Sequence, residues 1–248
     1  MPDRPVTACL IVIGNEILSG RTQDANLAYL GARLNDIGVR LMEARVIPDI
    51  EEVIVETVNE ARRRFSYVFT TGGIGPTHDD ITAASIAKAF GVPLVQNPEA
   101  RAILEAYYPT GELNEARLRM ANAPEGATLI ENPVSNAPGF QMDNVFVMAG
   151  IPAIAQAMFE GLAHRLVGGK PLLSRSVTVY LPESKLAPDF EALQGRYPDV
   201  EMGSYPFSRS GRFGARLVLR STEEARLAAA EAELETALRE LGGEPAWD

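Results

Sequence analysis

The order of apolar patterns in the first 90 residues constrains the fold of this chain more than any other feature. Short runs rich in β-branched residues have the length of buried strands and occupy residues 8–13, 39–46 and 67–70. Amphipathic periods, with apolar side chains three or four residues apart, follow them at residues 27–37, 50–65 and 81–90. A strand that alternates with a helix in this way predicts a mostly parallel sheet with helices on both faces. We therefore expect a three-layer α/β/α domain.

The apolar pattern continues with less regular spacing to about residue 168. It predicts further helices at residues 98–107, 112–121 and 153–166, and short strands at 128–130, 140–142 and 145–148. The small-residue run Gly168-Gly169-Lys170-Pro171 interrupts this pattern. Beyond it, the sequence predicts strands at 176–181, 200–205 and 212–219, and helices at 185–196 and 222–241. We expect two domains, residues 1–168 and a small α+β domain of residues 172–248.

Composition excludes several classes of protein. A content of 46% hydrophobic and 23% charged residues is typical of a globular protein. The single Cys9, expected in the core, cannot form an internal disulfide, and one Cys with two His is too few for a structural zinc site. The net charge of −10 argues against nucleic acid or an anionic membrane as partner. No run approaches the ~20 apolar residues of a membrane span, so we expect a cytoplasmic protein.

The strongest local signal is the sequence of residues 70–82, Thr-Thr-Gly-Gly-Ile-Gly-Pro-Thr-His-Asp-Asp-Ile-Thr, at the carboxyl end of a predicted central strand. Its glycines let backbone N–H groups approach an anionic ligand at the start of the next helix. Ligands of open α/β sheets bind outside the carboxyl ends of the strands. The alternative is a tight turn in which Asp79 or Asp80 caps the helix. Two adjacent carboxylates repel each other unless a cation lies nearby, so the pair also suggests a divalent-cation site.

A second polar loop, residues 14–20, follows the first strand and should emerge on the same rim of the sheet. Glu16, Asn15 and Asn26 could hydrogen-bond a ligand, although a plain polar loop with a turn at Gly20 fits as well. Asp49 follows the second strand and has capping-box spacing to Glu52. It could cap the next helix, face a ligand, or do both.

Three further features have mainly structural interpretations. The small-residue loops at 132–140 and 149–152 lie at strand ends, where a ligand could approach the backbone, but most such loops are turns. His78 could serve as a general acid or base, although a solvent-facing loop position is the commoner case. His164 lies on a predicted helix and is expected to be structural.

These motifs, in this order, resemble the molybdopterin-binding domain superfamily that includes MoaB and MogA. The resemblance is closest to the N-terminal region of the competence/damage-inducible protein CinA and to the molybdopterin-binding-like domain of FAD synthase. The string Gly-Gly-x-Gly-Pro-Thr-x-Asp-Asp-x-Thr at 72–82 is the most specific part, with support from Gly14-Asn15-Glu16, Gly20, Asn26, Asp49, Asn132-Pro133 and residues 137–140. In the second domain, residues 203–206 and 215–219 look like the small domain that follows this fold in CinA and FAD synthase.

The resemblance implies a pocket for a pterin or dinucleotide, and self-association into a homo-oligomer. CinA-like and FAD-synthase-like members imply metal-dependent pyrophosphatase action on ADP-ribose or FAD. MogA-like members adenylylate molybdopterin with acids that match Asp49 and Asp80. This chain departs from the family pattern at three positions: it has Ile74 where Thr is usual, Ala149 where Pro is usual, and Ile154 where Glu is typical. We also expect neither the amidase domain of CinA nor the adenylyltransferase domain of FAD synthase within these 248 residues.

From the residues and the resemblance together we expect a hydrolase of a nucleotide pyrophosphate that depends on Mg²⁺, Mn²⁺ or Co²⁺. The alternatives are molybdopterin binding or adenylylation, and a non-catalytic nucleotide- or pterin-binding protein. The expected catalytic residues are Asp49, Asp79 and Asp80, of which Asp79 and Asp80 would hold the metal. The expected substrate-binding residues are Gly14, Asn15, Glu16, Ser19, Asn26, Thr71, Gly72, Gly73, Gly75, Thr82, Pro138 and Gly139.

Overall fold

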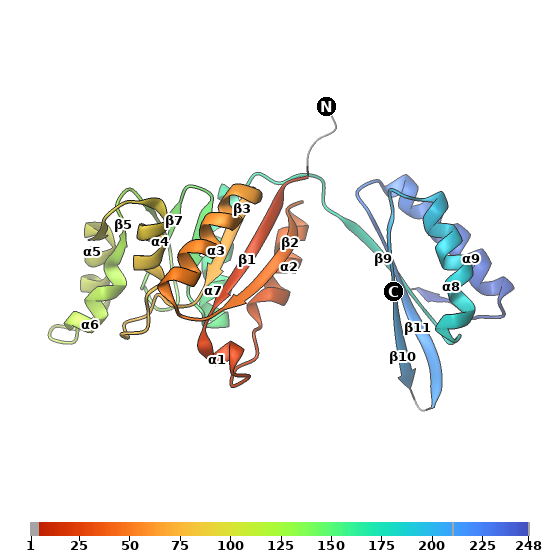
Figure 1. The fold of residues 1–248 in the computed structure, drawn as a ribbon, viewed down its shortest axis with the longest axis horizontal. Helices are drawn as coiled ribbons and strands as arrows, with labels where there is room; N and C mark the ends of the chain where they lie inside the picture. The colour runs from red at the N-terminus through yellow and green to blue at the C-terminus, as the bar shows by residue number, and fades with distance from the viewer. Residues whose placement is uncertain (1–4, 210, 248) are drawn as a thin grey trace. The chain divides into compact units, whose positions relative to one another are not determined.

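The computed structural model describes residues 5–209 and 211–247, and the chain in it divides into two compact units between Gly169 and Lys170. The sequence predicted domain limits of 168 and 172, close to this division. Figure 1 shows the course of the chain through both units. Within the described ranges, none of the helices has the length and apolar character that crossing a membrane requires.

The first unit is built on a six-stranded sheet in the order β2-β1-β3-β8-β7-β6. Its strands are β1 (Thr7–Ile13), β2 (Arg40–Ile47), β3 (Tyr67–Thr71), β6 (Thr128–Ile130), β7 (Gly139–Met142) and β8 (Val145–Met148). Strands β2, β1, β3 and β8 run parallel, whereas β7 pairs antiparallel with both β8 and β6. A turn joins β7 to β8, and Asp143 adopts a φ of 53° there.

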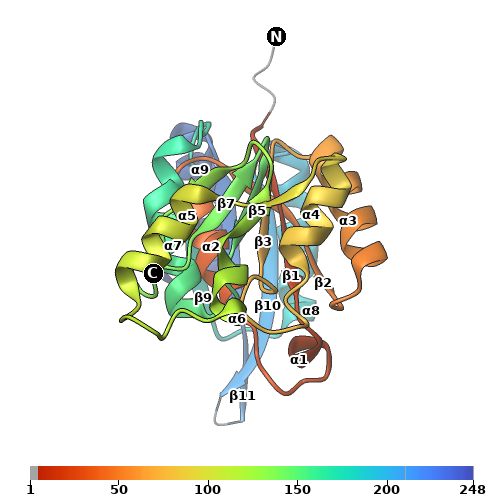
Figure 2. The same ribbon diagram turned by 90° about the vertical axis from the view of Figure 1, so that its left-hand side faces the viewer.

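Helices cover both faces of this sheet, as the alternating pattern predicted. They are α2 (Asn26–Asp36) and α7 (Pro152–Leu162) on one face, and α3 (Glu51–Arg64) and α4 (Thr82–Phe90) on the other. Figure 2 shows the strands between the two helical layers. Strand β1 is buried on both sides: Cys9 and Ile11 pack towards α3 and α4, while Leu10 packs towards α2 and α7. Burial on both faces explains why β1 reads as a continuous apolar run.

The segment between α4 and β6 differs from the prediction. It forms β4 (Leu94–Gln96), α5 (Pro98–Tyr107), α6 (Glu115–Leu118), a 3₁₀ turn η1 (Arg119–Ala121) and β5 (Asn122–Pro124). The predicted helix 112–121 is therefore wrong in extent. Asn114 caps α6 by accepting a hydrogen bond from the Arg117 amide at 2.9 Å, so the helix begins only at residue 115. Strands β4 and β5 pair antiparallel and were not predicted, because three residues show no recognisable period.

The second unit has a four-stranded antiparallel sheet in the order β10-β11-β9-β12. Its elements are β9 (Leu173–Val179), α8 (Glu183–Arg196), β10 (Glu201–Arg209), β11 (Arg212–Ser221), α9 (Glu224–Glu240) and β12 (Ala246–Trp247). One core cluster joins buried strand residues such as Val177 and Leu217 to Leu186 of α8 and Leu234 of α9. This arrangement is the α+β module that the sequence predicted, with β12 as an addition.

Candidate functional site

A cavity of about 610 Å³ lies in the first unit at the carboxyl ends of its parallel strands. Each parallel strand contributes the loop that follows it: Gly14 after β1, Asp49 after β2, residues 72–76 after β3 and residues 149–152 after β8. This is the position at which open α/β sheets bind ligands. The cavity is therefore the candidate functional site of this unit.

The glycines after β3 are required by positive φ angles and by the close approach of neighbouring atoms. Gly72 has a φ of +106°, and a Cβ atom there would lie 2.1 Å from the carbonyl oxygen of Ile13. Gly73 has a φ of +68°, and its Cβ would lie 2.1 Å from Oγ1 of Thr82. That hydroxyl donates a hydrogen bond to the Gly72 carbonyl at 3.0 Å and joins the loop to the start of α4. Thr82 thus holds the loop closed and lies outside the cavity lining.

The acidic pair does not cap α4. The N-cap of α4 is Ile81, which makes no side-chain capping bond, so the alternative in which Asp79 or Asp80 is the cap is wrong. Asp80 instead accepts hydrogen bonds at Oδ2 from the amide of Thr77, at 2.8 Å, and from its hydroxyl. The Thr77 hydroxyl is also the main cause that lowers the pKa of Asp79, followed by the backbone amide of Asp79. Both carboxylates line the cavity.

His78 lies beside this pair on the same loop. Its side chain is 94% exposed, and its Nδ1 atom lies 4.0 Å from Asp79. His78 is absent from the cavity lining, which favours the interpretation of a solvent-facing loop residue.

Asp49 connects two loops of the rim. Its Oδ2 atom accepts a hydrogen bond from the amide of Asn15 at 2.9 Å. The predicted capping box with Glu52 does not form, because Ile50 is the N-cap of α3 and α3 has no side-chain capping bond. The carboxylate of Asp49 therefore positions the loop after β1 while facing the cavity.

Glu16 lies on α1 (Asn15–Leu18), a short helix where the sequence predicted an irregular polar loop. Its carboxylate folds back towards Gly14: a Cβ atom on Gly14 would lie 2.5 Å from Glu16 Oε1. Both residues line the cavity.

The predicted site residues fall into two groups. Those that line the cavity are Gly14, Glu16, Asp49, Gly72, Gly73, Gly75, Asp79 and Asp80. Those outside the lining are Asn15, Ser19, Asn26, Thr71, Thr82, Pro138 and Gly139. Pro138 instead lines a neighbouring cavity of about 90 Å³, which shares Asp80 with the larger one.

The residues outside the lining have structural contacts. Asn26 is only 3% exposed and donates from Nδ2 to the Gly150 carbonyl at 2.9 Å, which supports the loop after β8. Ser19 donates to the carbonyl of Glu16. Gly139 lies so close to Val147 that a Cβ would come within 2.2 Å of its carbonyl oxygen. Thr71 is buried at the end of β3.

The sequence alone did not identify the part of the lining that comes from the segment between α5 and β5. Tyr108, Arg117 and Met120 line the cavity from that side. Asn132, which the resemblance had included, also lines it, and its side chain fixes residues 132–137 through bonds to Ser135 and to the Ala137 carbonyl. No local pattern marks Tyr108 or Arg117 as functional, because their position depends on how α5 and η1 pack.

The charges of the cavity are strongly unbalanced. Among the described residues, its lining contains four carboxylates (Glu16, Asp49, Asp79 and Asp80) and one basic side chain, Arg117. Residues 5–209 and 211–247 contain no group of three or more His, Cys, Asp or Glu side chains arranged to hold a metal ion. Asp79 and Asp80 both line the cavity and carry carboxylate oxygens, the kind of ligand that Mg²⁺ takes together with phosphate and water.

Comparisons with known proteins agree with this architecture. The sequence model of the family described as "Probable molybdopterin binding domain" matches residues 9–169, and that of "FAD synthase, middle domain" matches residues 171–242. A protein of Aeropyrum pernix is 36% identical over 254 residues and covers 95% of each chain. A protein of Pyrobaculum calidifontis is 38% identical and covers 81% of this chain and 80% of its own. The names of both relatives specify no activity.

Solved structures also resemble this chain. The crystal structure of the protein CinA from Thermoplasma acidophilum, described as having unknown function, has a TM-score of 0.61 and 32% identity. The match covers 64% of this chain and 96% of that one.

Proposed function

The chain belongs to the MoaB/MogA-like molybdopterin-binding domain family, in a CinA-like form, and from this premise we propose that it hydrolyses a nucleotide pyrophosphate with the help of a divalent cation. The substrates we propose are ADP-ribose and FAD. The observation that carries the proposal is the cavity in which four carboxylates and a glycine loop meet at the ends of the parallel strands. The match of the second unit to the middle domain of FAD synthase favours a dinucleotide over other phosphates.

Asp79 and Asp80 would hold the cation, which neutralises phosphate charge and lowers the pKa of an attacking water molecule. The backbone amides of residues 72–75 are suited to orient the phosphate, since the glycines leave no Cβ between them and a ligand. Among the described residues, Glu16 forms no ion pair with a lysine or arginine, and its carboxylate can accept a hydrogen bond from the ligand or from water. Asp49 keeps the loop after β1 in place through the Asn15 amide. Water then cleaves one P–O bond of the pyrophosphate and gives two monophosphates.

A second candidate is binding or adenylylation of molybdopterin, which the description of the matching family favours. All three departures from the family pattern, Ile74, Ala149 and Ile154, lie in the cavity lining, and two of them bear on the choice. Ile74, in place of Thr, weakens the molybdopterin assignment, whereas Ile154, in place of Glu, favours a pocket that binds without turnover. Binding without turnover is the third candidate.

The test is a hydrolysis screen. Purified protein is incubated with ADP-ribose or FAD in Mg²⁺, Mn²⁺, Co²⁺ or EDTA, and released AMP is measured. We expect AMP in at least one metal and none in EDTA. If both substrates stay intact in every metal, the pyrophosphatase proposal is wrong. Tight molybdopterin binding that FAD does not displace would then support the second candidate.

A further inference from the structure

Arg117 is unusual among the arginines of the first unit because it faces a cavity of opposite charge. Two arginines of the outer surface each contact both oxygens of one carboxylate: Arg33 those of Glu160, and Arg45 those of Glu60. Arg117 lies 3.3 Å from a single carboxylate oxygen, that of Glu112, and is the one basic side chain of the described cavity lining. It comes from α6, which the proposed reaction leaves without a role.

The guanidinium of Arg117 is held in position but keeps free donors. Its Nη1 atom donates to the carbonyl of Glu112 at 2.6 Å and lies 3.3 Å from a carboxylate oxygen of the same residue. Its central carbon lies 4.3 Å from the centroid of the Tyr108 ring, at cation–π distance. Within residues 5–209 and 211–247, its Nε and Nη2 atoms donate no hydrogen bond. The edge of the guanidinium that carries Nε and Nη2 is therefore available to donate hydrogen bonds to a ligand.

An anion that enters this cavity meets repulsion from four carboxylates. A guanidinium with unused donors matches the geometry of a phosphate group and carries its charge at any ordinary pH. Among the described residues of the lining, Arg117 is thus the positively charged side chain that can attract a phosphate into the cavity before any metal ion contributes. Tyr108, which lies against the guanidinium, forms an apolar wall of the same cavity together with Met120 and Ile154.

We infer that Arg117 binds a phosphate of the ligand directly and without a metal ion, and that the apolar wall beside it takes the attached aromatic ring. The inference rests on the proposed function for the identity of the ligand, a nucleoside diphosphate or its derivative. It divides the cavity into a recognition part around Arg117 and a cation-dependent part around Asp79. Arg117 then sets ligand affinity, whereas Asp79 sets the response to metal.

Calorimetric titration with ADP in EDTA tests the recognition part. We expect Arg117→Gln to bind ADP about tenfold to a hundredfold more weakly than the parent, the range for loss of a hydrogen bond to a charged group. Arg101→Gln is the matched control, because Arg101 pairs with Glu105 on the neighbouring α5 and lies outside the lining. Arg117→Lys keeps the positive charge but loses the planar guanidinium donors, so its affinity for ADP should lie between those of the parent and Arg117→Gln. Circular dichroism checks that each variant is folded.

Two further titrations separate the parts. Asp79→Asn should bind ADP more tightly than the parent in EDTA, since one repelling charge is gone, and should gain less affinity from added Mg²⁺. Inorganic pyrophosphate should bind more weakly than ADP in EDTA, because it has no ring for the apolar wall. Equal affinity for the two ligands would overturn the assignment of that wall.

The outcomes distinguish this inference from the proposed function. If the parent hydrolyses ADP-ribose but Arg117→Gln binds ADP as the parent does, the inference is wrong and the proposed function stands. If the parent hydrolyses neither substrate but loses ADP affinity on Arg117→Gln, the proposed function is wrong and the inference stands. If the parent does not bind ADP in EDTA at all, Arg117 is not a metal-independent phosphate site.

Discussion

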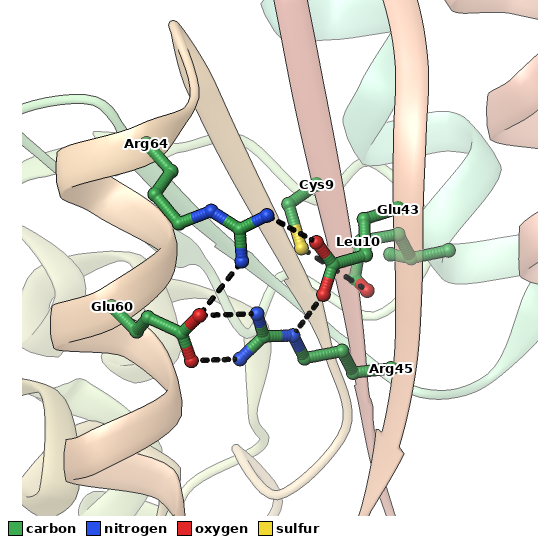
Figure 3. A network of polar contacts seen from close by, with 6 residues as sticks. All are labelled: Cys9, Leu10, Glu43, Arg45, Glu60 and Arg64. Carbon is green, nitrogen blue, oxygen red and sulfur yellow. Dashed lines mark hydrogen bonds and ion pairs between the residues drawn. The ribbon is translucent and has the colours of Figure 1, made fainter.

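Two groups of acidic side chains in the first unit differ in what neutralises them. On the outer surface, Glu43 of β2 and Glu60 of α3 share two arginines, Arg45 and Arg64 (Figure 3). Arg45 lies 2.5 Å from Glu43 and bonds to both oxygens of Glu60, at 2.7 and 3.0 Å. These hydrogen bonds hold the pKa of Glu60 at about 2, well below its usual 4.5.

The carboxylates of the cavity have no such partners. Among the described residues, no lysine or arginine forms an ion pair with Glu16, Asp49, Asp79 or Asp80. Asp49 and Asp80 accept hydrogen bonds from the backbone and from Thr77 instead. The surface group is thus neutralised within the folded chain, whereas on the proposed function the cavity group takes a cation from outside. We therefore expect the first group to serve stability and the second to serve ligand binding.

The largest effect should come from Gly72→Ala, because backbone contacts and not charges shape the cavity. The new Cβ would lie 2.1 Å from the Ile13 carbonyl oxygen, at a φ of +106°. We expect the free energy of unfolding to fall by about 3–5 kcal/mol, from backbone strain and overpacking together. Urea unfolding measures the change. Gly20→Ala is the control: its φ is +70° but no atom lies within 4 Å of a Cβ there, so it should cost only about 1 kcal/mol. Equal costs would show that the close approach to Ile13 is unimportant.

The next largest effect is expected from Asp79→Asn, which tests the role of the carboxylates that line the cavity. We expect the cation-dependent release of AMP to fall about a hundredfold, since a neutral amide is a poor ligand for a hard cation. The unfolding midpoint should stay close to that of the parent, because Asp79 is 67% exposed and, among the described residues, forms no ion pair with a lysine or arginine. Glu60→Gln is the matched control, because it neutralises a carboxylate of the surface group, and it should keep full turnover. A Glu60→Gln variant that loses turnover would contradict the separation of the two groups.

Part of the candidate site could be predicted from the sequence, because it depends on where the strands end. Gly14, Asp49 and Gly72 were predictable because parallel strands end on one edge of the sheet, so the residues after each strand must converge. The interpretation of Asp49 as a helix cap was wrong for a physical reason. Spacing to Glu52 describes only local contacts, whereas the Asp49 carboxylate bonds to Asn15, 34 residues away.

Arg117 and Tyr108 could not be predicted in the same way. They enter the cavity because Leu104 and Ala121 pack into a small cluster of their own, and because β4 and β5 pair over three residues each. Neither feature leaves a periodic trace in the sequence. The three-layer fold, by contrast, follows from apolar runs long enough to show a period, such as those of β1 and α3.

A smaller effect is expected from Arg45→Gln, which removes the central cation of the surface group. Arg45 is 20% exposed, so solvent screens its pairs only in part. We expect a loss of roughly 1–2 kcal/mol in the free energy of unfolding, from hydrogen bonds to charged groups that are partly exposed. Turnover should be unchanged. Added salt should shrink the difference from the parent, and a difference that does not respond to salt would mean that packing of the Arg45 stem, not its charge, is responsible.

The smallest effect concerns the pH dependence of the same group. The pKa of Glu60 is about 2 in the folded chain, compared with the ordinary value of 4.5 expected in the unfolded chain. The contribution of Glu60 to the free energy of unfolding is therefore fully present above about pH 5. As the pH falls towards 2, the unfolded state takes up the proton first, and the contribution is lost. The parent should therefore be more stable than Glu60→Gln at pH 7, and this difference should shrink between pH 5 and pH 2. Urea unfolding at each pH measures it. Since Glu60 is exposed, the contribution at pH 7 is itself small, and an equal difference at pH 3 and pH 7 would show that Glu60 stabilises β2 and α3 by something other than its charge.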